Sequence, residues 1–473
     1  CGSSVFASLA TQPKRCSGTA SLVAMSAQPF VQAGASRSQG EVERCEAPRE
    51  RRSFGAKLLA TMGPGLMVCF ADTDGSCLLT AADSGSQWRY RLLLLQVALI
   101  PILYFAQELS VRLGLFRGKG LTALLREVAG PRWAWAVAVP LLLDAFLALI
   151  SEVNVFAQTV QVCWDVPQRL TSTAFTLCLL ALVFTGSYHV AEKVGLVMGS
   201  LQVVFFATVV MSKPHGDDIW SDLFEFPLNE GGYVRLITAN IGAVIMPWML
   251  AYQQSAVCEK GLGSLADVKE HLLLERIDTA MGSVLTQGVM AAMLITVAAS
   301  PKFAGKDIDD VSQLLEIFAE VMGGRSRAKV LLTLAICGAC TVAAIVVTLC
   351  GSWALEGAMG SEPVEQSRGI IEHVHARPAF FVAYTFTCLV VWLVISIAPE
   401  FADNLTGVWT QFVNGLLMPP VIFSLWFLAS YGLPPEHRLK GCFKWFLLVL
   451  FGVCALFCFA SIPIAIADAL SSN

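Results

Sequence analysis

Long apolar segments separated by short polar connectors make up most of the chain. Such segments predict transmembrane helices, because a hydrocarbon core about 30 Å thick needs roughly 20 apolar residues. About eleven spans are predicted, at residues 58–82, 91–110, 134–164, 171–187, 190–212, 234–257, 279–299, 329–351, 379–398, 404–430 and 442–468. The expected fold class is an all-α integral membrane protein with about 11 transmembrane helices.

The first predicted span is interrupted halfway by the sequence Asp72-Thr73-Asp74-Gly75-Ser76. A carboxylate at membrane depth is costly, so an acid in this position is by default a functional-site candidate. The Gly-Ser pair continues a helix poorly, and irregular backbone within a membrane must be covered by protein or line a cavity. The pattern therefore predicts a broken helix with a cation site at the break.

A second interruption lies in the sixth predicted span, where Gly242, Met246 and Pro247 are expected to break an otherwise apolar helix. A proline inside a helix removes one backbone hydrogen bond and leaves a carbonyl free. Interrupted helices at corresponding places in two halves point to an inverted-repeat transporter with its site near the midplane. We expect an inverted 5+5 repeat of the LeuT-like type with broken helices 1 and 6, the repeats covering residues 58–212 and 234–430 and an extra helix covering 442–468.

The composition agrees with a membrane protein. Hydrophobic residues make up 55% of the 473 positions and charged residues 14%, and the mean hydropathy is +0.64. An ordinary soluble domain carries about 25% charged residues. The 15 cysteines lie mostly in apolar spans and are interpreted as small buried hydrophobes. We expect the lipid bilayer as the main partner, no nucleic acid partner, and a monomeric chain.

Residues 1–53 lack hydrophobic periodicity and are rich in Ser, Ala, Gln and Arg, which predicts a disordered cytosolic tail. An organellar transit segment is the alternative, although the acidic residues of the second half of the tail argue against it. Because the sequence begins with Cys, we expect a fragment or a processed form. The distribution of Lys and Arg among the connectors favours a cytosolic N-terminus.

Three segments resemble the natural resistance-associated macrophage protein (Nramp) family of divalent-metal transporters. GPGLMVCFADTDGSCLLTAADSGSQWRY at 63–90 is similar to the family's first-helix signature, which runs GPG, then Asp-Pro-Gly-Asn, then Gly-x-Gln-x-x-Tyr. ELSVRLGLFRGKGL at 108–121 resembles the connector between the second and third helices, and GAVIMPWMLAYQQSA at 242–256 the sixth-helix segment around Met-Pro-His. The likeness extends over most of residues 60–430.

The resemblance implies a set of metal-binding positions. Asp74 matches the family's metal-binding aspartate, Met246 its thioether ligand, and Ala243 the residue that offers a backbone carbonyl, while Gln411 matches a polar residue near the ion path. Carboxylate and carbonyl oxygens suit hard divalent ions, and a thioether adds preference for softer transition metals. The alternatives are that Asp74 only caps or pairs within the bundle and that Met246 only packs.

The departures from the family pattern concern the same site. Gly75-Ser76-Cys77 stands where the family has Pro-Gly-Asn, so an amide ligand is lost and either the Cys77 thiol or extra space replaces it. Asp72 adds a second carboxylate, which either strengthens binding of a divalent ion, shares a proton with Asp74, or faces an aqueous vestibule.

Proton coupling is expected to be weak or absent. The family's histidine after Met-Pro is Trp248 here, and span nine carries no arginine where the family's proton route has one. Glu152 in span three lies where an acidic proton-path residue is expected, whereas Asp144 is out of register. Without the histidine, no group at that point changes charge near neutral pH.

The resemblance leads us to expect a divalent cation transporter that works by alternating access, with the transported ion in place of any permanent cofactor. Met246 and Cys77 favour Mn²⁺ or Fe²⁺, whereas Asp72 and the small Gly75 and Ser76 favour Mg²⁺, which keeps several waters when bound. Two alternatives stay open: a membrane metal sensor, and an amino-acid transporter of the same inverted-repeat fold. No enzyme is expected, because the sequence has no HExxH motif, phosphate loop or nucleophile elbow.

Overall fold

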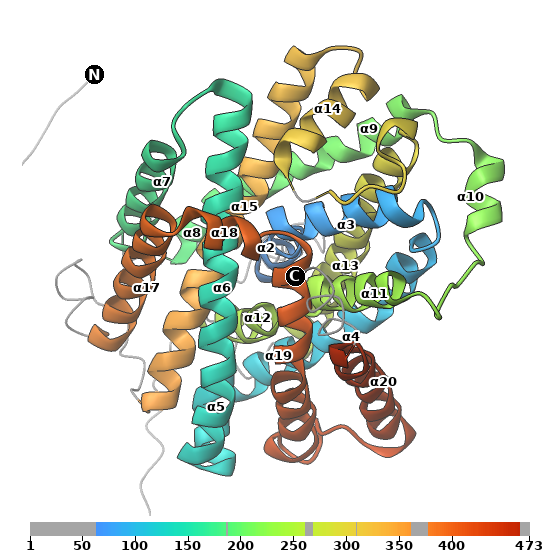
Figure 1. Ribbon diagram of the computed structural model, residues 1–473. Coiled ribbons are helices and arrows are strands. Elements are labelled where there is room, and N and C mark those ends of the chain that lie inside the picture. The colour runs from blue at the N-terminus through green and yellow to red at the C-terminus, as the bar shows by residue number, and fades with distance from the viewer. Residues whose placement is uncertain (1–62, 186–187, 261–267, 309, 361–376, 464–473) are drawn as a thin grey trace, which may run out of the picture. The chain divides into compact units, whose positions relative to one another are not determined.

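The computed structural model describes residues 63–463 apart from 186–187, 261–267, 309 and 361–376. The expected tail at 1–53 and the ends of the first and last predicted spans lie outside this part of the chain. Within it nearly every residue is helical and no strand occurs (Figure 1). Nine spans in it are long and apolar enough to cross a membrane. The interrupted first span consists of two shorter helices, and the apolar helix at 168–183 has only 16 residues. The all-α membrane fold is thus confirmed.

The helices follow the predicted spans in order. The first half contains α2 (Pro64–Asp72), α3 (Gly75–Trp88), α4 (Leu93–Arg117), α5 (Leu121–Ala129), α6 (Pro131–Trp164), α7 (Gln168–Val183), α8 (Tyr188–Ser200), α9 (Phe205–Ser212) and α10 (Gly216–Asp222). The second contains α11 (Gly231–Val244), α12 (Pro247–Glu259), α13 (Val268–Ala298), α14 (Val311–Val321), α15 (Arg325–Met359), α17 (Pro378–Ile397), α18 (Pro399–Leu405), α19 (Val408–Phe427) and α20 (Gly441–Ala460).

The first predicted break lies between α2 and α3. Thr73 leaves the helical conformation with φ −101° and ψ 50°, and Asp74 is extended with φ −66° and ψ 175°. The Asp74 side chain accepts a hydrogen bond from the backbone N–H of Cys77 at 2.7 Å. This is the N-cap arrangement, which satisfies a donor that a helix N-terminus otherwise leaves unpaired.

The second predicted break lies between α11 and α12, at Ile245 and Met246, whose φ and ψ are −118°/64° and −74°/132°. Pro247 is the first residue of α12, a position where its missing N–H has no helical partner to lose. Gly242 stays inside α11 instead of forming part of the break. Its missing side chain lets α19 approach α11 closely, because a Cβ there would overlap the carbonyl oxygen of Gln411.

Corresponding helices of the two halves pack in matching pairs. The pair α2 and α8 in the first half has its counterpart in α11 and α19, and α3 with α13 has its counterpart in α12 with α4. Across the halves, α6 packs on α15, α7 on α17 and α4 on α13. These reciprocal contacts are those expected of an inverted repeat. They leave the four half-helices α2, α3, α11 and α12 in the interior (Figure 1).

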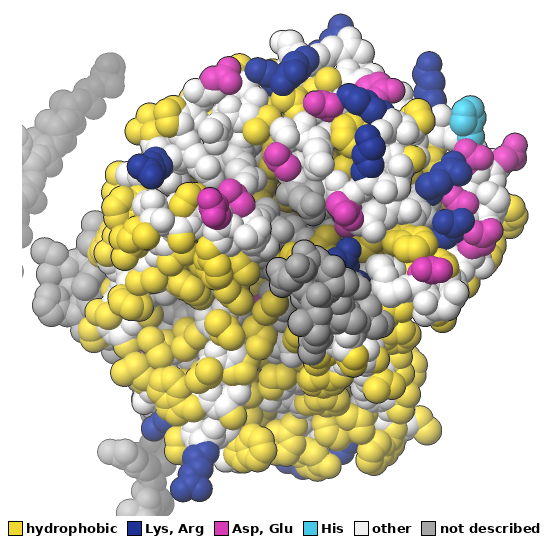
Figure 2. Space-filling model, in the orientation of Figure 1, with side chains coloured by type: hydrophobic (Ala, Val, Ile, Leu, Met, Phe, Trp, Pro, Cys, Tyr) yellow, Lys and Arg dark blue, Asp and Glu magenta, His cyan; other side chains and the backbone are white. Residues whose placement is uncertain are grey.

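The outer surface carries a broad hydrophobic band. In Figure 2 hydrophobic side chains cover the middle and lower part of the visible face, while charged side chains gather mainly above them. The outer faces of α17 and α20 expose Val382, Phe386, Val449 and Leu456, each by 65% or more. Such an apolar band is what a surface in contact with lipid tails requires.

We predict that Gly242→Ala destabilises the protein by about 1–3 kcal/mol, the usual cost of overpacking a well-packed core. The added Cβ would lie 2.7 Å from the backbone nitrogen of Gly415 on α19, where neither backbone can move aside easily. Thermal denaturation of the purified protein in detergent measures the change.

Gly452→Ala on α20 is the matched control, because a Cβ there meets nothing within 4 Å. We expect this variant to keep or raise the stability, since alanine is the better helix former by up to about 1 kcal/mol. Equal melting temperatures for the two variants would contradict the close approach of α11 and α19.

Candidate functional site

The Asp74 carboxylate lies at the start of α3 and is almost fully buried, with 1% of the residue exposed. Its Oδ1 accepts hydrogen bonds from the Cys77 backbone N–H at 2.7 Å and from the Gln411 side-chain amide of α19 at 3.3 Å. The Gln411 amide in turn pairs with that of Asn414 at 2.8 Å. Two residues predicted from the sequence, 337 positions apart, therefore meet at the first helix break.

The two helix breaks are connected by a sulfur contact. The Cys77 thiol on the first turn of α3 donates to the backbone carbonyl of Ala243 near the end of α11, at 3.3 Å. Asp74, Cys77, Ala243 and Gln411 thus lie around one point between α3, α11 and α19. Met246 begins α12 as its buried N-cap residue.

Helix α6 provides a carboxylate for each break. Glu152 accepts from the Gly75 backbone N–H at 3.1 Å and from the Ser76 hydroxyl at 3.4 Å. Asp144, eight positions earlier, accepts from the Trp248 backbone N–H at 3.0 Å. Both acids are fully buried. A carboxylate is stabilised at a helix N-terminus by the unpaired N–H groups and by the helix dipole.

A third acid occupies a comparable position at α2. Asp278 of α13 accepts from the backbone N–H groups of Gly63 and Gly65, at 3.4 and 3.0 Å. Asp278 was not among the residues expected at the site, and Asp144 was expected to lie out of register. Intramembrane acids were a usable signal for both, but their partners lie more than 100 positions away in the chain.

Asp72 is the last residue of α2 and is fully buried. Neither of its carboxylate oxygens has a hydrogen-bond partner among the described residues. A negative charge at the C-terminal end of a helix is also disfavoured by the dipole. Asp72 is therefore a buried acid that nothing in this part of the chain neutralises, next to the site around Asp74.

The small residues after Asp74 allow close helix packing. A Cβ on Gly75 would lie 2.7 Å from Val155 of α6 and 2.8 Å from the Cys340 sulfur of α15. The Ser76 hydroxyl lies 2.5 Å from that of Ser151. Gly75 and Ser76 therefore bring α3 against α6 and α15, and these helices fill the space that was expected there for a hydrated ion.

Trp248 follows Pro247 in the first turn of α12 and is fully buried. Its indole N–H has no partner among the described residues, so the hydrogen bond that anchors this position runs through the backbone to Asp144. Helix α17 contains no arginine, and the nearest one, Arg377, precedes its first residue. Neither position thus carries a group that titrates near neutral pH.

The donors around Asp74 are of mixed type. Across the described ranges no group of three or more His, Cys, Asp or Glu side chains is arranged to hold a metal ion. The groups that converge are one carboxylate, one backbone carbonyl, side-chain amides and a thiol. A dehydrated or partly hydrated divalent cation fits such a set, since oxygen donors suit hard ions and sulfur suits softer ones.

The family model and the relatives that match this chain belong to the same family of proteins. The family model described as natural resistance-associated macrophage protein-like (Nramp) matches residues 65–462. The chain is 27% identical over 385 residues to a Pseudomonas aeruginosa protein named divalent metal cation transporter MntH 1, covering 79% of this chain and 84% of that one. It is 26% identical over 436 residues to a Ralstonia nicotianae divalent metal cation transporter MntH, covering 88% and 94%.

A solved structure shows the same fold. The Eremococcus coleocola manganese transporter superposes with a TM-score of 0.72 at 19% identity, over 90% of both chains.

We predict that Asp144→Ala lowers the stability by about 1–3 kcal/mol, the cost of leaving a buried donor without a partner. Asp144→Asn is the matched variant, because its amide oxygen can still accept from the Trp248 backbone N–H, and a smaller loss is expected. Thermal denaturation in detergent measures both. Equal losses would show that the hydrogen bond to Trp248 does not hold the second break.

Proposed function

The chain belongs to the Nramp family of divalent metal transporters, and from this premise we propose that it carries a divalent metal cation through alternating access around Asp74. The observation that supports this proposal is the meeting of Asp74, the Ala243 carbonyl and Gln411 between two interrupted helices. Met246 and Cys77 are the proposed sulfur ligands. One helix bundle rocking against the other would open the site first to one side of the membrane and then to the other.

Mn²⁺ is the proposed main substrate, with Fe²⁺ as a chemically similar ion. Two sulfur-bearing residues at the breaks, Met246 and Cys77, favour a transition metal over Mg²⁺. The relatives are named as divalent metal or manganese transporters. The close packing around Gly75 and Ser76 leaves little room for the waters that Mg²⁺ usually keeps. Mg²⁺ is the second candidate because the unpartnered Asp72 carboxylate supplies a further hard oxygen ligand.

An amino-acid substrate fits the site poorly. In the inverted-repeat fold a substrate carboxylate is held by the N-termini of half-helices. Here those positions are taken by protein carboxylates, Asp74 and Glu152 at α3 and Asp144 at α12. An anionic group would be repelled by them, whereas a cation would be attracted.

Charge bears on the direction of the proposed transport, on its driving force and on its proton coupling. We place the N-terminus in the cytosol, as the distribution of Lys and Arg favours. In this orientation we propose that the ion moves from the outside into the cytosol. The membrane potential then contributes about 2.3 kcal/mol per charge per 100 mV. The presence of Trp248 and the absence of arginine from α17 support transport with weak or no proton coupling. We also propose that a single chain is the transporting unit.

We predict that Asp74→Asn and Asp74→Ala each reduce Mn²⁺ uptake into proteoliposomes by at least about tenfold, because the ion loses its charged ligand in a buried site. Asp217→Asn on the exposed α10 is the control and should transport like the wild type. Uptake by Asp74→Asn at the wild-type rate, with a normal melting temperature, would contradict the assignment of Asp74 as a metal ligand.

We predict that the wild-type protein takes up Mn²⁺ without acidifying the vesicle interior, since the Trp248 side chain, which stands where the family has a histidine, cannot carry a proton. A pH-sensitive dye enclosed in the vesicles records this together with uptake, and Mg²⁺ is tested in parallel. Acidification that scales with Mn²⁺ uptake would show coupling by another route, and uptake of Mg²⁺ in preference to Mn²⁺ would reverse the proposed selectivity.

A further inference from the structure

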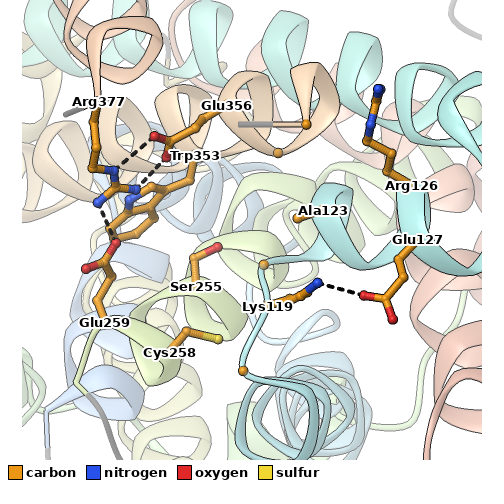
Figure 3. Close-up of a pocket in the computed structure, with 14 residues that line it drawn as sticks. Lys119, Ala123, Arg126, Glu127, Ser255, Cys258, Glu259, Trp353, Glu356 and Arg377 are labelled. Atoms are coloured by element: carbon orange, nitrogen blue, oxygen red, sulfur yellow. Dashed lines mark hydrogen bonds and ion pairs between the residues drawn. The ribbon is translucent and has the colours of Figure 1, made fainter. Parts of the chain in front are cut away.

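A cavity of about 490 Å³ opens at the end of the bundle where α4, α12 and α15 terminate (Figure 3). In the orientation proposed above this is the cytosolic end. The negative ends of three helix dipoles meet there, an arrangement that favours cations. The cavity wall contains both acids and bases, among them Lys119, Arg126, Glu127, Glu259, Glu356 and Arg377.

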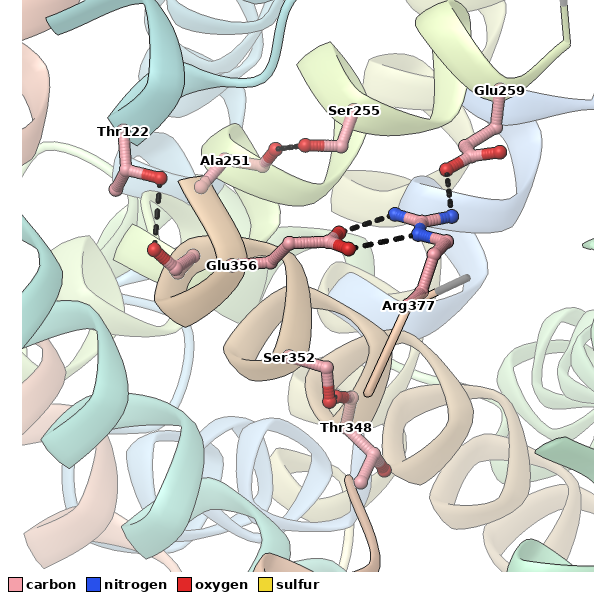
Figure 4. Close-up of polar contacts among 9 residues, drawn as sticks. Thr122, Ala251, Ser255, Glu259, Thr348, Ser352, Glu356 and Arg377 are labelled. Atoms are coloured by element: carbon pink, nitrogen blue, oxygen red, sulfur yellow. Dashed lines mark hydrogen bonds and ion pairs between the residues drawn. The ribbon is translucent and has the colours of Figure 1, made fainter. Parts of the chain in front are cut away.

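Arg377 closes one side of this cavity. Its guanidinium donates to both carboxylate oxygens of Glu356 on α15, at 3.0 and 2.5 Å, and to Glu259 at the end of α12, at 2.7 Å (Figures 3 and 4). It also lies over the Phe380 ring, 4.9 Å from the centroid. Burial lowers the pKa of Arg377, but its two carboxylate partners outweigh burial and hold the pKa above its ordinary value. The Arg377 guanidinium is therefore charged at any physiological pH.

Small and polar side chains recur along α15 between the level of the ion site and this bridge. Thr348, Ser352 and Glu356 are four residues apart and lie near one side of the helix, whereas Ala344 and Cys340, further up α15, are turned away from Glu356 by about 120° and 160°. At the upper end the Cys340 sulfur lies against Gly75, next to Asp74. At the lower end Glu356 binds Arg377.

A similar set of side chains lies along α12, which packs against α15. It consists of Ala251, Ser255 and Glu259, again four residues apart, and begins one turn below Pro247 (Figure 4). Ser255 and Ser352 are both largely buried, with 8% and 2% exposed. The two sets end in the two carboxylates that Arg377 joins.

We propose that Arg377 is a gate residue: its bridge from Glu356 to Glu259 closes a route for the cation that runs between α12 and α15 to the cavity. The identity of the ion in this inference rests on the proposed function. The movement, a separation of α12 from α15 and α17, is independent of which ion is carried.

The contacts indicate which half of the bridge breaks. Glu356 and Arg377 belong to α15 and to the start of α17, which pack together, so this pair stays closed. Glu259 is the last residue of the half-helix α12. The next residue, Lys260, binds Glu192 of α8 at 3.0 Å. The end of α12 is thus tied on two sides, and opening requires the Arg377–Glu259 pair to separate.

The test uses a thiol placed behind the bridge. Ser352→Cys puts a sulfur one turn from Glu356 toward the ion site, where it is shielded while the bridge is closed. Glu259→Gln is then added, which removes the charge on α12 and leaves the buried Arg377–Glu356 pair intact. We expect modification of that thiol by a small cationic thiol reagent in the full-length protein, followed by peptide mass spectrometry, to become about five- to tenfold faster.

Glu127→Gln in the same Ser352→Cys background is the matched control. Glu127 lines the same cavity and binds Lys119 at 2.9 Å and Arg117 at 2.5 Å, but these residues belong to α4, α5 and their connector and do not hold α12. We expect no change in the modification rate. Should Glu259→Gln fail to fold, Glu259→Asp, which keeps the charge but shortens the reach, serves in its place and should give a smaller increase.

An unchanged modification rate in the folded Glu259 variants overturns the gate, and so does an equal increase in Glu127→Gln. Failure of the proposed function looks different, because it would abolish Mn²⁺ uptake by the wild type while the Glu259→Gln variant still exposes the thiol. That result supports the gate and contradicts only the assignment of the cargo.

Discussion

The unpaired N–H groups of interrupted helices inside a membrane are the constraint on which the site depends. A broken helix exposes donors that lipid cannot satisfy, so each break must find acceptors within the protein. At α3 the acceptors are Asp74 and Glu152, and at α12 the acceptor is Asp144. Without these carboxylates the two breaks would lack a stable geometry, and the groups that face the ion would lack fixed positions.

The pairing of these N–H groups with carboxylates also determines the electrostatic character of the site between the two helix breaks. The N-termini of the half-helices are paired with protein acids, which leaves the carbonyl of Ala243, the carboxylate of Asp74 and the Gln411 amide, whose NH₂ group donates to Asp74, around the space between the breaks. Asp72 adds a carboxylate without a partner in the described structure. This site is therefore rich in carboxyl and carbonyl oxygens, which a cation can bind.

Much of this arrangement could be predicted from the sequence because it depends on residues that are adjacent in the chain. Asp74-Gly75-Ser76 and Met246-Pro247 combine residues that end helices with residues that bind ions, so both breaks were predicted at the right place. The roles of Asp144 and Arg377 were not predicted, because each depends on a partner more than 100 residues away. The small size of Gly75 was misread for a related reason: whether a glycine leaves space or admits a neighbouring helix depends on how α6 and α15 pack.

The most direct test of the account is the position of the bound ion. Crystals of the protein grown with Mn²⁺ would be measured for anomalous scattering, which locates the metal independently of any transport assay. The account predicts one strong peak within coordination distance of the Asp74 carboxylate, between the breaks of α2–α3 and α11–α12. A strong peak elsewhere with none at Asp74 would contradict it.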